Sequence, residues 1–281
     1  MVSYLIQHWN SVECLQEYLI GNWQSASTFE IKTRFLQEPL REAISKTLSA
    51  NNEPYAPSSI EFVYPNAILP PRVPNTHDPF VLEAQESDIE FIQHTESLDE
   101  ESEISQWTWA YDNQGKGDIH GFKESIQYVL EILHEQGPFI GVIGFSMGAA
   151  LAALIASLLE PHRRPRNSHF NSYNIQHPPL QFAVCFSGFM LSQTQYRYLY
   201  YPKIETPILH FIGKLDPWIS GSQTLKLARK CRSAKVAYFM GTHYVPRTKE
   251  TVKMLVQFVT DACGGGEGES IESLESDWVD I

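Results

Sequence analysis

The residues around Ser146 have the pattern of a strand, a turn and a helix. The run "GPFIGVIGFSMGAALAALIASLLE" is continuously apolar over 139–145 and rich in Ala and Leu over 147–160. The apolar stretch predicts a strand buried on both faces, and the Ala-rich stretch predicts a helix packed on it. A serine between two glycines at this junction fits a strained turn that lifts the hydroxyl above the sheet. The alternative is a glycine-rich turn with a capping serine.

Strands and helices alternate through most of the remaining chain. Such alternation predicts an α/β protein with a mostly parallel sheet and helices on both faces. We predict strands at 60–64, 139–145, 181–187, 207–212 and 235–240, and helices at 28–48, 121–136, 147–160, 221–231 and 248–261.

Two segments depart from this regular pattern. Apolar residues are spaced by three or four along 3–19, which predicts a helix there. Residues 65–120 are proline-rich, then acidic, then aromatic, and they are too long for an ordinary connection. We interpret 65–120 as an insertion or cap that lines or covers a site. We therefore expect a single domain over 1–261, with an atypical start at 1–20.

The net charge of −12 is unevenly distributed. Residues 83–103 carry nine acidic residues and no Lys or Arg, and the chain from Gly264 onward carries six acids and no base. These stretches contain more acids than the net charge requires, so the rest of the chain is nearly balanced. The charge argues against nucleic acid or an anionic membrane as a partner. The tail at 262–281 is predicted to be acidic and disordered.

Other sequence patterns indicate the compartment and the absence of a cofactor. The four cysteines form no CxxC pair, which favours a reducing compartment, and we expect the cytoplasm. No apolar run is long enough to span a membrane, the start does not resemble a signal peptide, and the end shows no targeting motif. The sequence contains no HExxH motif, no His/Cys ligand spacing and no phosphate-binding loop, so we expect no metal and no cofactor.

Candidates to activate Ser146 follow it in the chain. A serine hydroxyl needs a base, and this kind of turn predicts the order Ser, then Asp or Glu, then His, after successive strands. Asp216 in "FIGKLDPWI" follows the predicted strand 207–212, and His243 in "YFMGTHYVP" follows the predicted strand 235–240. We expect His243 to accept the serine proton and Asp216 to orient the imidazole. The alternative role for Asp216 is a turn former before proline.

Further residues are candidates for binding the substrate. The backbone N–H of Met147, at the start of the predicted helix, is a candidate oxyanion donor, because a helix N-terminus favours negative charge. Trp107 and Trp109, with Tyr111, indicate a contact with an apolar acyl group, and so does Phe189 after "SGF". The aromatic residues of the insertion fit the core of a cap equally well.

Three quoted stretches together resemble a known family. The segments around Ser146 ("GPFIGVIGFSMGAA"), Asp216 ("TPILHFIGKLDPWI") and His243 ("GTHYVPR") are similar to the fungal serine hydrolase family, over about residues 22–258. That family includes the animal ovarian-cancer-associated hydrolases and the thioesterase-like hydrolases of fungal polyketide clusters. The resemblance implies an α/β-hydrolase fold and cleavage of esters or thioesters by a Ser-Asp-His triad at these three positions.

The resemblance also implies a second oxyanion donor and a class of substrate. The family begins with a strand ending in Leu-His-Gly, and its following loop supplies the donor. The matching stretch here is Leu19-Ile20-Gly21-Asn22-Trp23, which places the donor at Asn22 or Trp23 and replaces the histidine by Ile20. The expected substrate is a small-molecule ester or thioester, or a carrier-bound acyl chain, in polyketide (secondary-metabolite) biosynthesis.

One alternative from another class stays open at the level of the sequence. A helix at 3–19 would leave the strand beside the nucleophile strand missing or shortened. The chain would then be a non-catalytic or impaired binding protein on the same fold.

Overall fold

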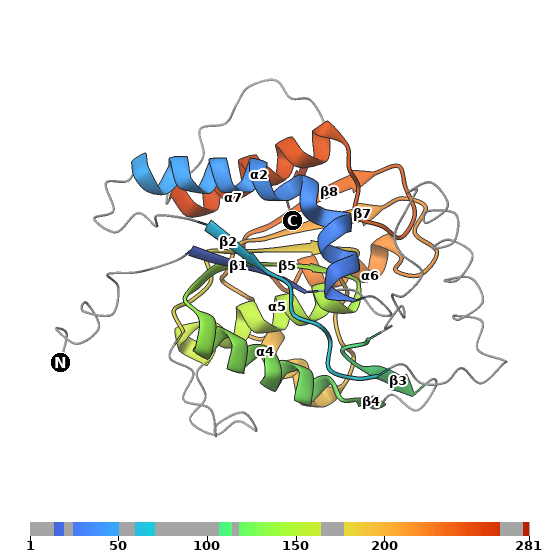
Figure 1. Ribbon diagram of the computed structural model, residues 1–281. Helices are drawn as coiled ribbons and strands as arrows, with labels where there is room; N and C mark the ends of the chain where they lie inside the picture. Colours follow the sequence, from blue (N-terminus) through green and yellow to red (C-terminus); the bar gives the residue numbers. More distant parts are fainter. Residues whose placement is uncertain are drawn as a thin grey trace, which may run out of the picture.

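The computed structural model describes residues 14–19, 25–50, 60–70, 107–113, 118–163, 177–264 and 278–280. They form a seven-stranded sheet in the order β2-β1-β5-β6-β7-β8-β9, with helices on both faces (Figure 1). All neighbouring strands are parallel except β8 and β9. The strands are β1 Cys14–Leu19, β2 Ile60–Val63, β5 Phe139–Phe145, β6 Phe182–Phe186, β7 Ile208–Gly213, β8 Ala234–Phe239 and β9 Trp278–Asp280.

The helices cover the sheet as the apolar patterns predict. Helices α2 and α7 pack against each other on one face, and α4 and α5 lie on the other (Figure 1). Every residue of α5 is buried, because its small alanines allow the helix to lie close to the sheet. The helices are α2 Ala26–Ala50, α4 Phe122–Gln136, α5 Met147–Leu159, α6 Gly221–Ala228 and α7 Lys249–Gly264, with short 3-10 turns η1 Pro161–Arg163 and η2 Thr194–Tyr200.

Helix α2 continues through Pro39. A proline inside a helix removes one backbone hydrogen bond and commonly bends the helix. Figure 1 shows α2 bent partway along its length. The apolar periodicity of this segment is confirmed, since its buried residues recur every three or four positions. They are Phe29, Thr33, Leu36, Leu40, Ile44 and Leu48.

The predicted helix at 3–19 is wrong for its last six residues. Residues Cys14–Leu19 form β1, which lies between β2 and β5 and is parallel to both. The backbone hydrogen bonds of the two neighbouring strands decide the conformation here, and they override a local helical periodicity. A strand beside β5, which precedes Ser146, is therefore present, and it ends with Leu19 opposite Gly144. Residues 1–13 lie outside the described part of the chain.

The prediction of a disordered tail over 262–281 is wrong at both ends. Helix α7 continues to Gly264, and Trp278–Asp280 form β9, which pairs antiparallel with β8. A strand edge offers unpaired N–H and C=O groups to a returning segment, whatever the charge of the residues around it. Residues 265–277 lie outside the description.

The predicted insertion at 65–120 is described in part. Leu69 and Thr108 form an antiparallel bridge, with the Thr108 N–H donating to the Leu69 carbonyl at 3.0 Å. A small hairpin follows, made of β3 Tyr111–Asn113 and β4 Asp118–His120. In the chain, the hairpin lies directly before α4. Residues 71–106 and 114–117 are not among those described.

The sheet interior contains a buried histidine, from which we expect a pH dependence of stability. His210 in β7 has no exposed surface, its Nε2 lies 3.8 Å from Sγ of Cys231, and its Nδ1 has no hydrogen-bond partner among the described residues. Burial lowers the pKa of His210 to about 3. Below pH about 6.5, His210 therefore binds a proton in the unfolded chain but stays neutral in the folded chain. The free energy of unfolding consequently falls as the pH drops from about 6.5 toward 3.

We therefore expect His210→Leu to reduce the loss of stability on acidification. Between pH 7 and 4.5 the wild type should lose about 2.5 kcal/mol more of its free energy of unfolding than the variant. Urea unfolding at the two pH values measures this difference. Exposed His134 in α4 supplies the matched control, and His134→Leu should behave as the wild type. Equal losses in wild type and His210→Leu would contradict the expectation.

Candidate active site

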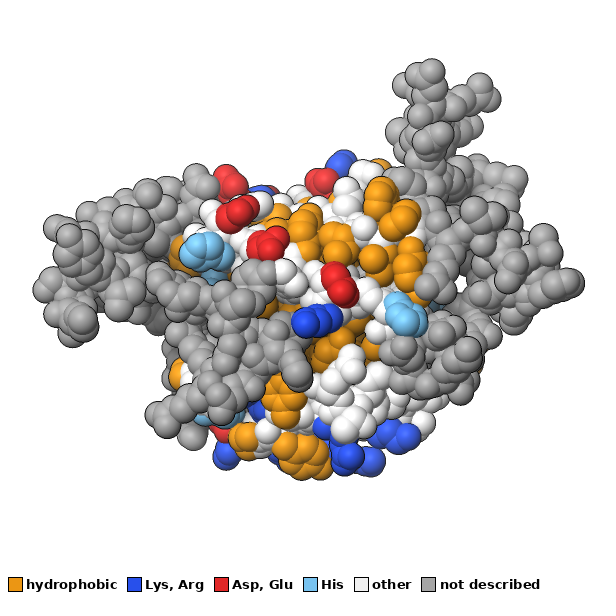
Figure 2. Space-filling model, turned by 90° about the horizontal axis from the view of Figure 1, so that it is seen from below, with side chains coloured by type: hydrophobic (Ala, Val, Ile, Leu, Met, Phe, Trp, Pro, Cys, Tyr) orange, Lys and Arg blue, Asp and Glu red, His pale blue; other side chains and the backbone are white. Residues whose placement is uncertain are grey.

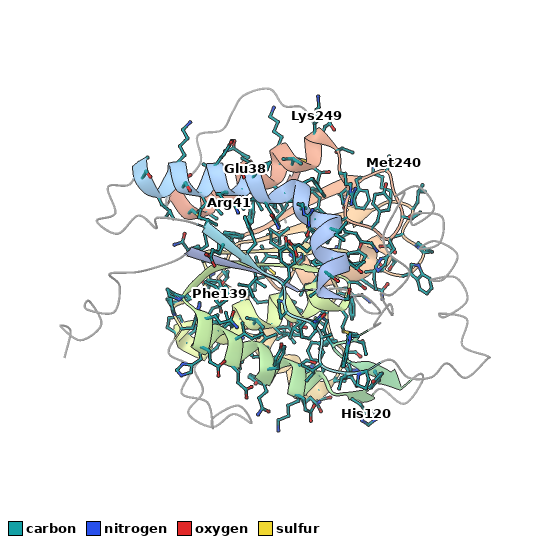
Figure 3. All side chains as sticks on the ribbon, viewed as in Figure 1. Glu38, Arg41, His120, Phe139, Met240 and Lys249 are labelled. Carbon is teal, nitrogen blue, oxygen red and sulfur yellow. The ribbon has the colours of Figure 1, made fainter. Side chains whose placement is uncertain are left out.

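The residues predicted to act together follow three strands at one end of the sheet. Ser146 follows β5, Asp216 comes shortly after β7, and His243 comes shortly after β8. Figure 3 labels Phe139, where β5 begins, and Met240, directly after β8, at opposite ends of the parallel strands. Carboxyl ends of parallel strands share one edge of the sheet, which is where open α/β sheets bind their ligands.

Ser146 occupies a strained turn between β5 and α5. Its φ of 55° and ψ of −118° lie outside the regions that side-chain-bearing residues usually adopt. The turn is held by hydrogen bonds: the Ser146 N–H donates to the Phe186 carbonyl at 2.9 Å, and its carbonyl accepts from Ala149 N–H at 3.0 Å. A side chain at Gly144 would collide with the Gly148 carbonyl. Glycine is therefore required at position 144 by this close approach of strand and helix.

Asp216 and His243 are joined by a hydrogen bond. His243 Nδ1 lies 2.8 Å from Oδ2 of Asp216. The Asp216 side chain has no exposed surface, whereas 18% of the His243 side chain is exposed. The imidazole therefore contacts a buried carboxylate and keeps some accessible surface, as a base that exchanges protons with a ligand requires.

The other oxygen of Asp216 forms the turn that its sequence context suggested. Oδ1 accepts from the backbone N–H groups of Trp218 and Ile219, each at 2.9 Å. Asp216 therefore shapes the turn with Oδ1 and contacts His243 with Oδ2, so the two roles weighed from the sequence coexist.

The surroundings of Asp216 favour its ionised form. Burial by itself raises the pKa of this carboxyl group, but the hydrogen bonds from His243, Ile219 and Ser187, together with the charge of His243, outweigh burial. The result is a pKa below its ordinary value. The carboxylate is charged at neutral pH and is available to stabilise a positive imidazole.

His243 lies against the residue that precedes Ser146. The ring centroids of Phe145 and His243 are 4.6 Å apart, with the planes inclined by 42°. This contact joins the loop after β8 to the end of β5. The structure thus brings His243 next to the strained turn and, through Asp216, to the loop after β7.

Of the predicted oxyanion donors, the structure describes Met147 but not Asn22 or Trp23. Met147 is the first residue of α5, where a backbone N–H has no acceptor within the helix and points toward the helix N-terminus. Asn22 and Trp23 lie outside the described residues. The last residue of β1, Leu19, lies opposite Gly144, which is two residues before Ser146.

The aromatic candidates for substrate contact differ in how deeply they are buried. The prediction is wrong for Trp109, which has no exposed surface and belongs to the hydrophobic core, so a ligand cannot reach it. Ser125 Oγ donates to the Trp109 carbonyl at 2.6 Å, which ties this residue to α4. Trp107 and Phe189 are partly buried against the core and keep accessible surface. Phe189 follows β6 at the same end of the sheet as Ser146.

Ser187 lies at this site and was not predicted as a site residue from the sequence. Ser187 was assigned to the end of a predicted strand, but β6 ends at Phe186 and Ser187 follows it with a φ of 49°. Its Oγ donates to Oδ2 of Asp216 at 2.8 Å. A usable signal was "FSGF": like Ser146, this serine directly follows a buried strand, and Gly188 comes directly after it.

The described residues offer neither a metal site nor a membrane-spanning helix. Among the described residues, no group of three or more His, Cys, Asp or Glu side chains is arranged to hold a metal ion. None of the helices in this part of the chain is long and apolar enough to cross a membrane. On the face seen in Figure 2, acidic and basic side chains both occur, interspersed with apolar ones.

The fold is that of an α/β-hydrolase. Acyl-protein thioesterase 2 of Zea mays superimposes with a TM-score of 0.51 at 16% identity, covering 90% of this chain and 95% of that one. Esterase PE8 gives a TM-score of 0.52 at 14% identity, covering 90% and 94%. At these identities the likeness concerns the fold alone.

The sequence comparisons show the family. The profile described as "Serine hydrolase (FSH1)" matches residues 17–255, and this chain belongs to that serine hydrolase family. A protein of Schizosaccharomyces pombe named dihydrofolate reductase is 32% identical over 165 residues, 59% of this chain and 34% of that protein. Esterase CG5412 of Drosophila melanogaster is 32% identical over 152 residues, 53% and 49% of the two chains. The matched region therefore spans between a third and a half of these relatives.

Proposed function

We propose that this chain is a serine esterase or thioesterase with Ser146, Asp216 and His243 as its catalytic triad. The hydrogen bond of 2.8 Å between Asp216 and His243, beside the strained turn at Ser146, is the observation that carries the proposal. Membership of a serine hydrolase family supports the same chemistry. The alternative of a non-catalytic protein depended on a missing or shortened strand beside β5, and the presence of β1 there supports the catalytic proposal.

In the proposed reaction, Oγ of Ser146 attacks the acyl carbonyl while Nε2 of His243 takes its proton. Asp216 accepts the Nδ1–H and stabilises the resulting imidazolium. The backbone N–H of Met147, with a second donor at Asn22 or Trp23, stabilises the negative oxygen of the tetrahedral intermediate. His243 then protonates the departing alcohol or thiol, and a water activated by His243 hydrolyses the acyl-enzyme.

The surface around the site favours an apolar acyl group. Three large apolar side chains close to the catalytic residues in the chain are exposed, and exposed apolar surface at a site favours an apolar ligand. Leu215 is 59% exposed and precedes Asp216, Tyr244 is 46% exposed and follows His243, and Met240 is 70% exposed. We extend the proposal to include Phe189 and Trp107 as contacts for this group.

The setting of the reaction stays a prediction from the sequence and the family. The three described free cysteines, all buried, are compatible with the reducing compartment and the cytoplasmic location that we propose. A carrier-bound substrate and a role in polyketide biosynthesis rest on the family resemblance.

A panel of substrates tests the proposal. Purified protein should hydrolyse p-nitrophenyl esters and acyl thioesters of short, medium and long chains, with kcat/KM of about 10⁴ M⁻¹s⁻¹ or more for at least one of them. Apolar contacts predict a preference for medium or long chains over acetyl. Matched peptides serve as the comparison, because ester and amide hydrolysis can use the same set of catalytic residues. Negligible rates across all esters and thioesters would refute the proposal.

A further inference from the structure

The carboxylate of Asp216 accepts four hydrogen bonds. Oδ1 accepts from two backbone N–H groups, which fix that half of the carboxylate to its own loop. Oδ2 accepts from His243 Nδ1 and from Ser187 Oγ, each at 2.8 Å. Ser187 is therefore the only side chain besides His243 among the described residues that is hydrogen-bonded to this oxygen.

Ser187 is itself held firmly. It has 1% exposed surface, and its N–H donates to the Phe211 carbonyl at 2.9 Å. Its φ of 49° is one that a glycine adopts without strain, yet a residue with a side chain occupies the position. The backbone of β6 and β7 thus aims the hydroxyl at Asp216, and the strained conformation fits a side chain that is used.

We propose that Ser187 is a positioning residue for the triad: its hydroxyl holds Oδ2 of Asp216 in the direction that the His243 Nδ1–H requires. The inference rests on the proposed function. Without the hydroxyl, His243 is the only partner that restrains Oδ2, and the carboxylate can turn about its Oδ1 hydrogen bonds. The imidazole then spends less time in the orientation needed to take the Ser146 proton, since catalysis depends on small differences in geometry.

Two substitutions of Ser187 and one control test this role. Ser187→Ala removes only the hydroxyl, and Ser187→Gly also relieves the backbone, so both are expected to fold. Both should lower kcat about tenfold, as the loss of a hydrogen bond to a charged group predicts, with KM nearly unchanged because Ser187 does not contact the substrate. Ser157→Ala is the matched control: Ser157 is equally buried and donates to the Leu199 carbonyl at 2.6 Å. It should keep kcat within about twofold of the wild type.

A double-mutant cycle separates positioning from a general structural effect. In an Asp216→Asn background, Ser187→Ala should change kcat by less than about twofold, because the carboxylate that it positions is gone. The same tenfold loss in both backgrounds would overturn the inference, and so would unchanged kcat in both Ser187 variants. If the wild type hydrolyses no ester or thioester, the proposed function fails and the inference fails with it. An active wild type with unaffected Ser187 variants refutes the inference alone.

Discussion

Replacing Ser146 by alanine is expected to lower kcat for the best ester about 10⁴- to 10⁶-fold and to abolish covalent labelling by a fluorophosphonate probe. Without Oγ there is no nucleophile and no acyl-enzyme. Only substrate binding and oxyanion stabilisation remain, and these account for a small residual rate. Alanine is the appropriate substitution because it keeps a Cβ at the φ of 55°, so the strained turn is unchanged.

Ser125→Ala is the control for this loss. Ser125 is a buried serine in α4, and its hydroxyl donates to the Trp109 carbonyl, remote from the triad in the chain. Its alanine variant should label and turn over as the wild type does, with a stability loss of about 1 kcal/mol. Labelling that persists in Ser146→Ala would show that another residue is the nucleophile, and the triad proposal would then be wrong.

Asp216→Asn is expected to lower kcat about 10⁴-fold while the fold is kept. The amide can still accept the two backbone hydrogen bonds through Oδ1. Its NH₂ group, however, takes the place of Oδ2 and donates to His243 Nδ1, so the imidazole adopts the tautomer with its proton on Nε2. A nitrogen that already carries a proton cannot take one from Ser146, and no carboxylate remains to stabilise the imidazolium.

Steady-state kinetics at neutral pH and thermal unfolding together check this expectation. Asp261 provides the control, because it is a carboxylate in α7 that accepts a hydrogen bond from Gln257 at 2.7 Å and takes no part in the proposed site. Asp261→Asn should retain wild-type kcat. A loss of less than about tenfold in a well-folded Asp216→Asn protein would argue that another residue orients His243.

Much of the fold could be predicted because its central elements have strong local patterns. The predicted strand at 139–145 agrees with β5, and the predicted helix at 121–136 agrees with α4 to within one residue. Continuous apolar runs and clear helical periodicity are properties of the segment itself. The two misassigned segments, Cys14–Leu19 and Trp278–Asp280, are strands because of partners elsewhere in the chain. A short segment with mixed polarity has no pattern strong enough to indicate such pairing.

In the candidate site, too, some residues could be predicted from the sequence and others depend on contacts between distant segments. Ser146, Asp216 and His243 could be found from chain order, since each follows a predicted strand. The burial of Trp109 could not, because an aromatic residue in a long insertion has the same local pattern whether it lines a pocket or fills a core. Ser187 was missed for a related reason, since its partner Asp216 is 29 residues away.

The sequence by itself determined the class of the fold, the strained serine turn and the order of the three residues, because strand and helix preferences and glycine requirements act over a few neighbouring positions. The tertiary structure decided where those residues meet. In the folded chain, β1 pairs with β5, the strand that leads into the turn at Ser146. His243 is hydrogen-bonded to Asp216, which is 27 residues away in the sequence, and Ser187 donates to the same carboxylate oxygen. These contacts form between segments that only the packed sheet brings together, so their geometry depends on the register of whole strands.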